Sequence, residues 1–353
     1  MEGFRNAFTV IFRFLLALLL LAGCSPQTAA PVDLNLAGGS PHPVVIDTDM
    51  AADDWMAILY LLQRPDVEVL AITVSGTGEA HCEPGVRNAL GLAALAGRDS
   101  IRVACGRETP LQGQHTFPDS WRTSMDNLLG LSLPAGENAA GEQTAVDLLA
   151  ETLDSVPGKA AVLTLGPLTN LAGALQADPD LVEKIEMVYV MGGAVNVPGN
   201  LRVPGVEIDN AVAEWNIYVD PLAANLVFQS GVPVTLVGLD ATNHVPLNAK
   251  FYQQVKKSHA TPAADFVYQV LTAQKGFIDS GGYYFWDPLT AAVLADESLA
   301  TFTNKNLCVV EAEGPESGRT KPGESCPQVR VAVNADGDRF ESVFLQVLNL
   351  ASP

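Results

Sequence analysis

Short apolar runs alternate with helical segments along most of this 353-residue chain, and this alternation constrains the fold more than any other feature. In the first helical segment, Ala57, Ile58, Leu61 and Leu62 fall three, four, seven and eight positions after Asp54, so they form one apolar face. Strands that are continuous apolar runs and alternate with helices are typical of parallel sheets buried on both sides. The sequence therefore predicts an α/β fold with an open, mostly parallel sheet and helices on both faces.

The individual elements can be placed by their apolar spacing and by the Gly and Pro residues between them. We expect strands at residues 44–46, 67–73, 160–164, 187–191 and 232–237, and helices at residues 53–62, 87–95, 169–175 and 221–228. Towards the end of the chain we expect a hairpin at residues 307–333 and a closing helix at residues 340–350. Because the chain shows neither an internal repeat nor a linker after residue 43, we predict one domain over residues 43–353.

The N-terminus has the features of an export signal. The apolar stretch at residues 14–22 is too short to cross a bilayer, and it predicts a cleaved signal peptide at residues 1–23. It ends in Leu-Ala-Gly-Cys, which resembles a bacterial lipobox, so we expect a lipid on Cys24 and a tether at residues 24–42. Ser25 favours the outer membrane, facing the periplasm, by the same resemblance. An ordinary signal peptide with a chance cysteine is the alternative.

The remaining cysteines agree with an oxidising compartment, because Cys82, Cys105, Cys308 and Cys326 are even in number. Pairing Cys82 with Cys105 and Cys308 with Cys326 closes the shortest loops, and we predict these two disulfides. Four buried free thiols are the alternative. No pair has the C-x-x-C spacing of zinc or thioredoxin motifs.

The charge balance narrows the possible partners. The chain has 20 Lys and Arg residues against 40 Asp and Glu residues, a formal charge of −20. Binding to a phosphate backbone requires a positive surface, so we expect no nucleic-acid partner. Membrane contact is expected through the lipid anchor only.

The strongest chemical signal is a group of four aspartates within eight residues, where the first expected strand meets the first helix: Asp47, Asp49, Asp53 and Asp54. Ligand sites of open α/β sheets lie at the carboxyl ends of strands. Carboxylates packed together repel one another, and a hard cation such as calcium or magnesium removes that repulsion. The alternative, a favourable interaction with the helix dipole, explains Asp53 and Asp54 but not the other two.

Six motifs then follow in the order of one known family. They are DTDMAADD (47–54), TVSGT (73–77), LGPLTN (165–170), MGG with GN (191–200), EWNIYVDP (214–221) and WDPL (286–289). With these motifs in this order, the chain resembles the inosine–uridine nucleoside hydrolase family. The resemblance implies hydrolysis of the N-glycosidic bond of ribonucleosides to a free base and ribose, with calcium and without a nucleotide cofactor. Family members are commonly dimers or tetramers, so a homo-oligomer is expected.

The resemblance also assigns roles residue by residue. It places calcium between the carboxylates of Asp47, Asp49, Asp54 and Asp287 and the backbone carbonyl of Leu165, with the ribose diol completing the shell. Asp49 matches the general base that takes a proton from water. The residues that match those binding or underlying the ribose are Asp53, Met191, Asn200, Glu214 and Asn216.

Several of these residues have a simpler interpretation. Asn200 and Asn216 are also typical of turns and helix caps, and Met191 lies in an apolar run that predicts the core. Glu214, beside Trp215, fits a solvated helix start equally well.

The chain departs from the family pattern at three places. Thr77 replaces an Asn that binds ribose, Met50-Ala51 replaces Pro-Gly, and Trp286 replaces a His that is linked to protonation of the leaving base. We expect Thr77 or a neighbouring polar group to contact the sugar, and Trp286 to stack on the base as in the purine-preferring branch. The departures leave two alternatives open: a nucleoside- or ribose-binding lipoprotein without catalysis, and a hydrolase of another N-ribosyl compound.

Overall fold

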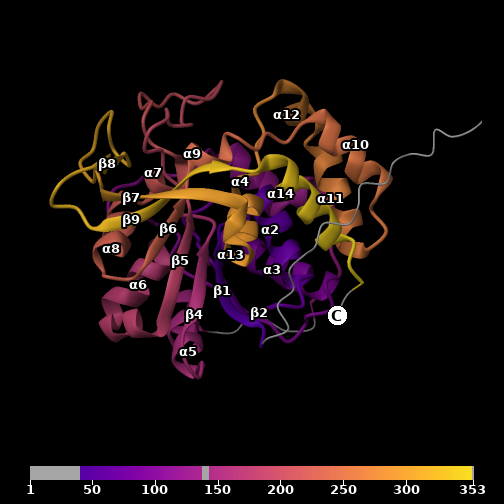
Figure 1. The fold of residues 1–353 in the computed structure, drawn as a ribbon, viewed down its shortest axis with the longest axis horizontal. Coiled ribbons are helices and arrows are strands. Elements are labelled where there is room, and N and C mark those ends of the chain that lie inside the picture. Colours follow the sequence, from indigo (N-terminus) through magenta and orange to yellow (C-terminus); the bar gives the residue numbers. More distant parts are fainter. Residues whose placement is uncertain (1–39, 137–142, 352–353) are drawn as a thin grey trace, which may run out of the picture. The chain divides into compact units, whose positions relative to one another are not determined.

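The computed structural model describes residues 40–136 and 143–351, which are built around a nine-stranded sheet with the order β3-β2-β1-β4-β5-β6-β9-β7-β8 (Figure 1). The neighbours from β3 to β9 are parallel, whereas β7 runs antiparallel to β9 and β8. The strands are β1 (His42–Thr48), β2 (Val67–Val74), β3 (Arg102–Cys105), β4 (Ala160–Thr164), β5 (Ile185–Met191), β6 (Val234–Val237), β7 (Ala300–Val309), β8 (Thr320–Pro322) and β9 (Gln328–Ala335).

Helices follow most of the parallel strands, as the apolar spacing predicts. They are α2 (Ala52–Leu62), α3 (Cys82–Leu95), α4 (Asp119–Asp126), α5 (Ala145–Ser155), α6 (Thr169–Ala177), α7 (Trp215–Val219), α8 (Pro221–Gln229), α9 (Leu239–Thr242), α10 (Ala249–Lys257), α11 (Pro262–Ala273), α12 (Lys275–Ser280), α13 (Trp286–Ala295) and α14 (Gly337–Leu348). The predicted fold class, an open and mostly parallel sheet with helices, is confirmed.

The sheet is covered on both faces because its strands are apolar on both sides. Val45 and Val162 belong to a core that β1 and β4 share with α5, α6 and α8. Successive side chains of a strand point to opposite faces. Val44 and Leu163, one position away, are fully buried outside that core, on the face that α2 and α13 cover. This alternation also decides where the side chain of Asp47 points.

The expected hairpin near the C-terminus is larger than the sequence indicated. β7 pairs with β9 from Ala300 to Asn306, and the short strand β8 pairs with β7 on its other side. The first expected strand also begins earlier: β1 starts at His42, within the range assigned to the tether. The helix expected at residues 87–95 is the second half of α3, which begins at Cys82.

The strand order reverses direction at β1, which is the feature that positions a site. From β1 the order runs through β2 to β3 on one side and through β4, β5 and β6 on the other. The loops after β1 and β4 therefore leave the sheet in different directions, and a crevice opens between them at the carboxyl ends of the strands. Backbone hydrogen bonds from Leu165 N to Asp47 O and from Ser75 N to Thr48 O, both 2.8 Å, tie the ends of the three central strands together.

Both predicted disulfides are present in the structure. Cys82 is bonded to Cys105 with a Cα–Cα distance of 5.5 Å, and Cys308 to Cys326 with a distance of 5.3 Å. The first disulfide joins the start of α3 to the end of β3, so it fixes the loop that follows β2. The second joins β7 to the segment before β9.

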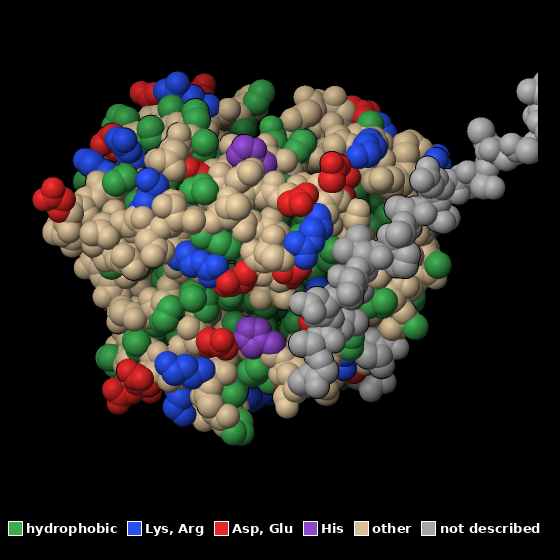
Figure 2. All heavy atoms as spheres, viewed as in Figure 1, with side chains coloured by type: hydrophobic (Ala, Val, Ile, Leu, Met, Phe, Trp, Pro, Cys, Tyr) green, Lys and Arg blue, Asp and Glu red, His purple; other side chains and the backbone are tan. Residues whose placement is uncertain are grey.

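The expected signal peptide, Cys24 and most of the tether lie outside the described residues. Within the described ranges, the structure contains no helix with the length and apolarity that a bilayer span requires. On the face of the molecule shown in Figure 2, acidic and basic side chains are interspersed.

Candidate active site

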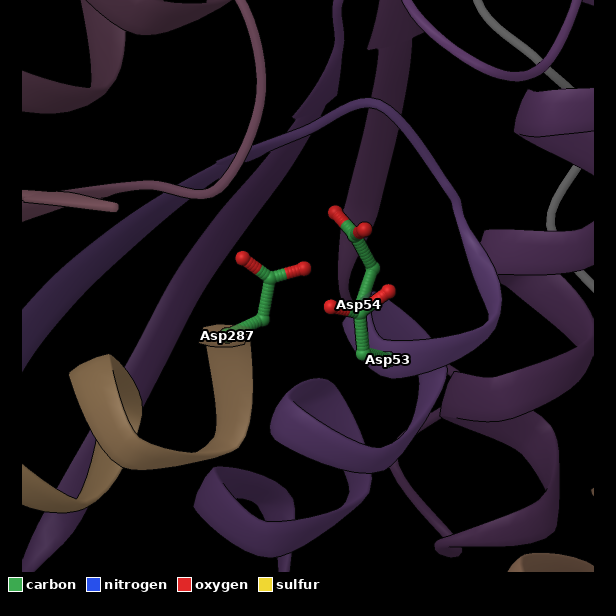
Figure 3. Close-up of side chains that lie close together, drawn as sticks. All are labelled: Asp53, Asp54 and Asp287. Atoms are coloured by element: carbon green, nitrogen blue, oxygen red, sulfur yellow. The ribbon is translucent and has the colours of Figure 1, made fainter. Parts of the chain in front are cut away.

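Three carboxylates from two helices converge at the carboxyl ends of the central strands. Asp53 and Asp54 lie in the first turn of α2 and Asp287 in the first turn of α13. One oxygen of each lies within 4.8 Å of the others, and Figure 3 shows the side chains pointing toward one another. They are 9%, 0% and 3% exposed, so water hardly screens their mutual repulsion. The N-terminal ends of both helices offset part of that repulsion through their dipoles.

Asp49 joins this group from the loop after β1. Its carboxylate accepts hydrogen bonds from Ala51 N and Glu79 N, each 3.3 Å. A Cβ atom at Gly78 or Gly166 would lie 2.0 Å or 2.5 Å from the Asp49 Cβ, so two glycines allow the surrounding loops to close around this side chain. Asp49 is therefore held between the loops that follow β1, β2 and β4.

Asp54 organises the turn that carries these residues. It accepts a hydrogen bond from the Thr48 hydroxyl and, at 3.1 Å each, from the backbone N–H groups of Asp49 and Ala51. Met50, between them, has a φ of 63°, whereas Ala51 is extended. A proline cannot adopt that φ, so this loop differs from the Pro-Gly form of the family motif, and Ala51 does not need the freedom of a glycine.

The electrostatics of the group fit a cation. Burial raises the pKa of Asp53 and of Asp54 from 3.8 to about 7. Burial, followed by the charge of Asp54, raises the pKa of Asp49 and of Asp287 well above its usual range. Among the described residues that line the adjoining cavity there is no Lys or Arg to balance these charges. A set of oxygen donors with uncompensated negative charge suits a hard divalent ion such as calcium.

Asp47 is the expected metal ligand that the structure does not bring to this group. Its carboxylate accepts hydrogen bonds from Thr73 Oγ1 at 2.6 Å and from Asn170 Nδ2 at 2.8 Å. Asp47 follows Val45 by two positions in β1, so its side chain points to the same face of the sheet, toward α6. Burial raises its pKa to about 7. Both hydrogen bonds go to Oδ1, and the buried Oδ2 has no partner among the described residues. Asp47 neither lines the cavity described below nor belongs to the group of Asp53, Asp54 and Asp287.

A cavity of about 600 Å³ adjoins the carboxylates and gathers most of the expected site residues. The expected residues that line it are Asp49, Asp53, Asp54, Leu165, Met191, Asn200, Glu214, Asn216, Trp286 and Asp287. These residues come from segments up to 238 positions apart in the chain, counted from Asp49 to Asp287. The volume is within the range of pockets that bind small organic molecules.

The polar residues on the β4 and β5 side are fixed by backbone contacts. Glu214 is 2% exposed and caps α7, where it accepts hydrogen bonds from the N–H groups of Asn216 and Ile217. The interpretation of Glu214 as a solvated helix start is therefore wrong, although it does begin a helix. Burial raises its pKa to about 7. Asn216 Nδ2 donates to the carbonyl of Leu165 at 2.9 Å, so that oxygen keeps one lone pair for another partner.

Thr77 does not reach the cavity. It is 2% exposed, and its hydroxyl lies 2.9 Å from that of Ser75 and 3.1 Å from that of Thr169. Thr169 in turn donates to Asp220, so the Thr77 hydroxyl is one link in an internal chain of hydrogen bonds. The expectation that Thr77 contacts the sugar is not supported by this position. Glu79, two residues later, lines the cavity instead.

Aromatic rings form part of the walls of the cavity. Trp286 lies 5.6 Å from Tyr283 and 6.3 Å from Phe277 between ring centroids. Trp121 lies in α4 and packs against Trp215 at 5.2 Å. The indole N–H of Trp286 and the hydroxyl of Tyr283 are buried without a hydrogen-bond partner among the described residues.

Sequence reasoning missed Glu79, Tyr283 and Phe277. The only available signal for Tyr283 was its place in the aromatic run before Asp287, and Glu79 had none beyond its closeness to Thr77.

Comparison with known proteins agrees with this geometry. The model of the inosine-uridine preferring nucleoside hydrolase family matches residues 44–342. The chain belongs to this family. It is 32% identical to uridine nucleosidase 1 of Arabidopsis thaliana over 80% of this chain and 82% of that protein. It is 36% identical to the pyrimidine-specific ribonucleoside hydrolase RihA of Citrobacter koseri, over 77% of this chain and 85% of the relative.

Solved structures show the same relationship. The plant nucleoside hydrolase PpNRh1 superposes with a TM-score of 0.78 at 30% identity, covering 88% of this chain and all of the plant chain. As a nucleoside hydrolase, the protein is an N-glycosyl hydrolase, and the carboxylate-lined cavity is the candidate for its active site.

Proposed function

We propose that this protein hydrolyses the N-glycosidic bond of ribonucleosides to a free base and ribose, that it requires calcium, and that it prefers purine nucleosides. The observation that carries the proposal is the convergence of Asp53, Asp54 and Asp287 beside Asp49 in a cavity with aromatic walls. Such a cavity offers a negatively charged end for a sugar and an apolar end for a base.

The residues suited to hold calcium are Asp49, Asp54, Asp287 and the carbonyl of Leu165, with Asp53 beside them. When bound, the ion would neutralise the carboxylates and fix the orientation of the ribose diol. This assignment replaces Asp47, which faces α6, and keeps the other ligands expected from the family resemblance.

The protein groups can then stabilise the reaction itself. Breaking an N-glycosidic bond proceeds through a sugar that resembles an oxocarbenium ion, and the surrounding carboxylates stabilise the positive charge that develops. Asp49, one of the residues suited to hold the ion, would accept the proton of the attacking water as a carboxylate. Glu214, Asn216 and Asn200 are held rigidly by backbone contacts, which positions them to bind ribose hydroxyls.

The preference for purines follows from the aromatic walls. Trp286, Tyr283 and Phe277 offer π-faces on which a two-ring base stacks more extensively than a single ring. The buried indole N–H of Trp286 offers a donor to the base. The two relatives described above carry names that specify uridine or pyrimidine nucleosides. Faster turnover of uridine and cytidine than of purine nucleosides would refute the preference and leave the hydrolase intact.

Chromatographic detection of the free base tests the function. The protein is incubated with inosine, adenosine, guanosine, uridine, cytidine and nicotinamide riboside, with calcium or with EGTA. We expect base release from the purine nucleosides with calcium, at least about 100-fold slower release by Asp49→Asn, and none with EGTA. Glu68→Gln, an equal charge change at an exposed position of β2, serves as the control.

The other outcomes of this assay separate the alternatives. Release from nicotinamide riboside alone would identify a different N-ribosyl hydrolase. Binding of nucleosides without any release would identify a binding lipoprotein and refute the proposal.

We also infer that the protein is exported and attached to the outer membrane through a lipid on Cys24, facing the periplasm. The two disulfides support an oxidising compartment. Metabolic labelling with palmitate tests the anchor: the wild-type protein should be labelled and the Cys24→Ala variant should not. Size-exclusion chromatography of the unanchored protein tests the expected homo-oligomer.

A further inference from the structure

Two polar side chains of the active-site cavity have no assigned role and no protein partner. The Tyr283 hydroxyl is buried, its residue is 2% exposed, and it forms no hydrogen bond among the described residues. No described side chain or backbone N–H donates to the Glu79 carboxylate either, although Glu79 lines the same cavity. Native structures rarely keep a buried polar group such as the Tyr283 hydroxyl unpaired unless water or a ligand satisfies it. Glu79 is partly buried, and its carboxylate is open to the cavity.

Both groups are held in place by their surroundings. Tyr283 accepts a backbone hydrogen bond from Leu247 N at 2.9 Å, and its ring is stacked on Phe277 at 5.0 Å. The Glu79 backbone donates to Asp49, while the neighbouring Ala80 donates to the Asp49 carbonyl at 3.0 Å. The Cys82–Cys105 disulfide closes this loop three residues after Glu79. Groups that are fixed in advance lose little entropy when they bind a ligand.

Both groups line the same cavity, so one ligand in it can contact each of them. The negative charge of Glu79 is one of those that, after burial, raise the pKa of the Tyr283 phenol, together with those of Asp53 and Asp287. The phenol is a hydrogen-bond donor, and the carboxylate is an acceptor. A hydroxyl group is the simplest partner that satisfies both at once, because it accepts from the phenol and donates to the carboxylate.

We propose that Glu79 and Tyr283 together bind one hydroxyl of the substrate's ribose and are specificity-determining residues of this enzyme. They supply the sugar contact that Thr77 cannot make, since the Thr77 hydroxyl is bonded to Ser75 and Thr169. This inference rests on the proposed hydrolysis of ribonucleosides and adds two residues to its site.

A cycle of variants and substrates tests the pair. The variants are Tyr283→Phe and Glu79→Gln, and the substrates are inosine and its 2′-, 3′- and 5′-deoxy forms, with calcium present. We expect kcat/KM for inosine to fall by about 3- to 10-fold in Tyr283→Phe and by about 10- to 100-fold in Glu79→Gln. One of the three deoxy forms lacks the hydroxyl that Glu79 and Tyr283 bind. On that substrate, neither substitution should change kcat/KM.

Matched controls exclude a general disturbance. Tyr284→Phe removes a hydroxyl one residue away from Tyr283, and Glu83→Gln removes an exposed carboxylate near Glu79. Neither residue lines the cavity, and both variants should behave as the wild-type protein.

The outcomes that overturn the inference are distinct from a failure of the proposed function. Equal losses of kcat/KM on inosine and on all three deoxy forms would show a structural role. If the loss in Tyr283→Phe disappears on one deoxy form and the loss in Glu79→Gln on another, the two residues do not share a hydroxyl. Unchanged kinetics on inosine would also overturn it. Failure of the proposed function appears as wild-type protein that releases no base. In that case the Kd values of the same variants and substrates are measured by calorimetry. The proposed contact is also overturned if neither substitution alters the affinity for inosine, or if the protein does not bind inosine at all.

Discussion

The buried carboxylates should make the calcium-free protein less stable as the pH rises. A carboxyl with a higher pKa in the folded than in the unfolded chain binds more protons when folded. Its contribution to the free energy of unfolding is therefore largest below the unfolded pKa and is lost as the pH rises through the folded pKa. For Asp53 and Asp54 this window runs from 3.8 to about 7.

The size of the effect follows from these values. One carboxyl whose pKa moves from 3.8 to about 7 costs the folded state about 4 kcal/mol above the window, at about 1.4 kcal/mol per pKa unit. That is a large part of the 5–15 kcal/mol that stabilises a typical domain. Calcium at about 1,000 times its Kd would restore about 4 kcal/mol, enough to offset one such carboxyl.

Urea unfolding measures this directly. The free energy of unfolding is determined at about pH 5.5 and about pH 8, each with EGTA and with excess calcium. We expect the EGTA samples to be several kcal/mol less stable at the higher pH, and calcium to remove most of that difference. Asp287→Asn should weaken the pH dependence and abolish the response to calcium, because it removes one of the converging charges, whereas Glu68→Gln should preserve both. Equal stability at both pH values in EGTA, together with no effect of calcium, would refute the reasoning.

Three further substitutions probe the walls of the site. Trp286→Leu should lower kcat/KM for inosine about 3- to 10-fold more than for uridine, because a two-ring base loses more stacking; equal losses on both nucleosides would contradict stacking on the base. Thr77→Val should lower the free energy of unfolding by about 1 kcal/mol and leave KM within about threefold, and a larger change in KM would place its hydroxyl against the substrate. Replacing Cys82 and Cys105 by Ser should lower kcat/KM more than removing the other disulfide, since only the first closes the loop of Glu79; equal kinetics of the two double variants would show that this loop holds its position unaided.

The sequence predicted those parts of the fold that local patterns encode. The strand at Ala160–Thr164 was predicted at its observed bounds because a fully buried parallel strand is a continuous apolar run between turn residues. β3 (Arg102–Cys105) was missed because it begins with an exposed Arg and has only two buried residues, so it lacks a continuous apolar run. α10 (Ala249–Lys257) was missed because it has only three buried side chains and carries several polar ones.

The site shows the same division between local and long-range information. Asp53 and Asp54 were found because four aspartates cluster where the first strand meets a helix, and Asp287 because its WDPL motif resembles that of the family. Asp47 was assigned to the metal because the motif was taken as a unit, although the alternation along β1 sends its side chain to the other face of the sheet. The role of Thr77 depends on Thr169, 92 residues away, and no local pattern indicates that contact.

Crystallography of the calcium-soaked protein tests the central claim most directly. Anomalous scattering should locate one ion bound by carboxylate oxygens of Asp54 and Asp287, with Asp49 at the same ion and Asp47 still bonded to Thr73 and Asn170. An ion held elsewhere, or no ion between Asp54 and Asp287 in crystals of protein that calcium activates, would contradict this account of the enzyme.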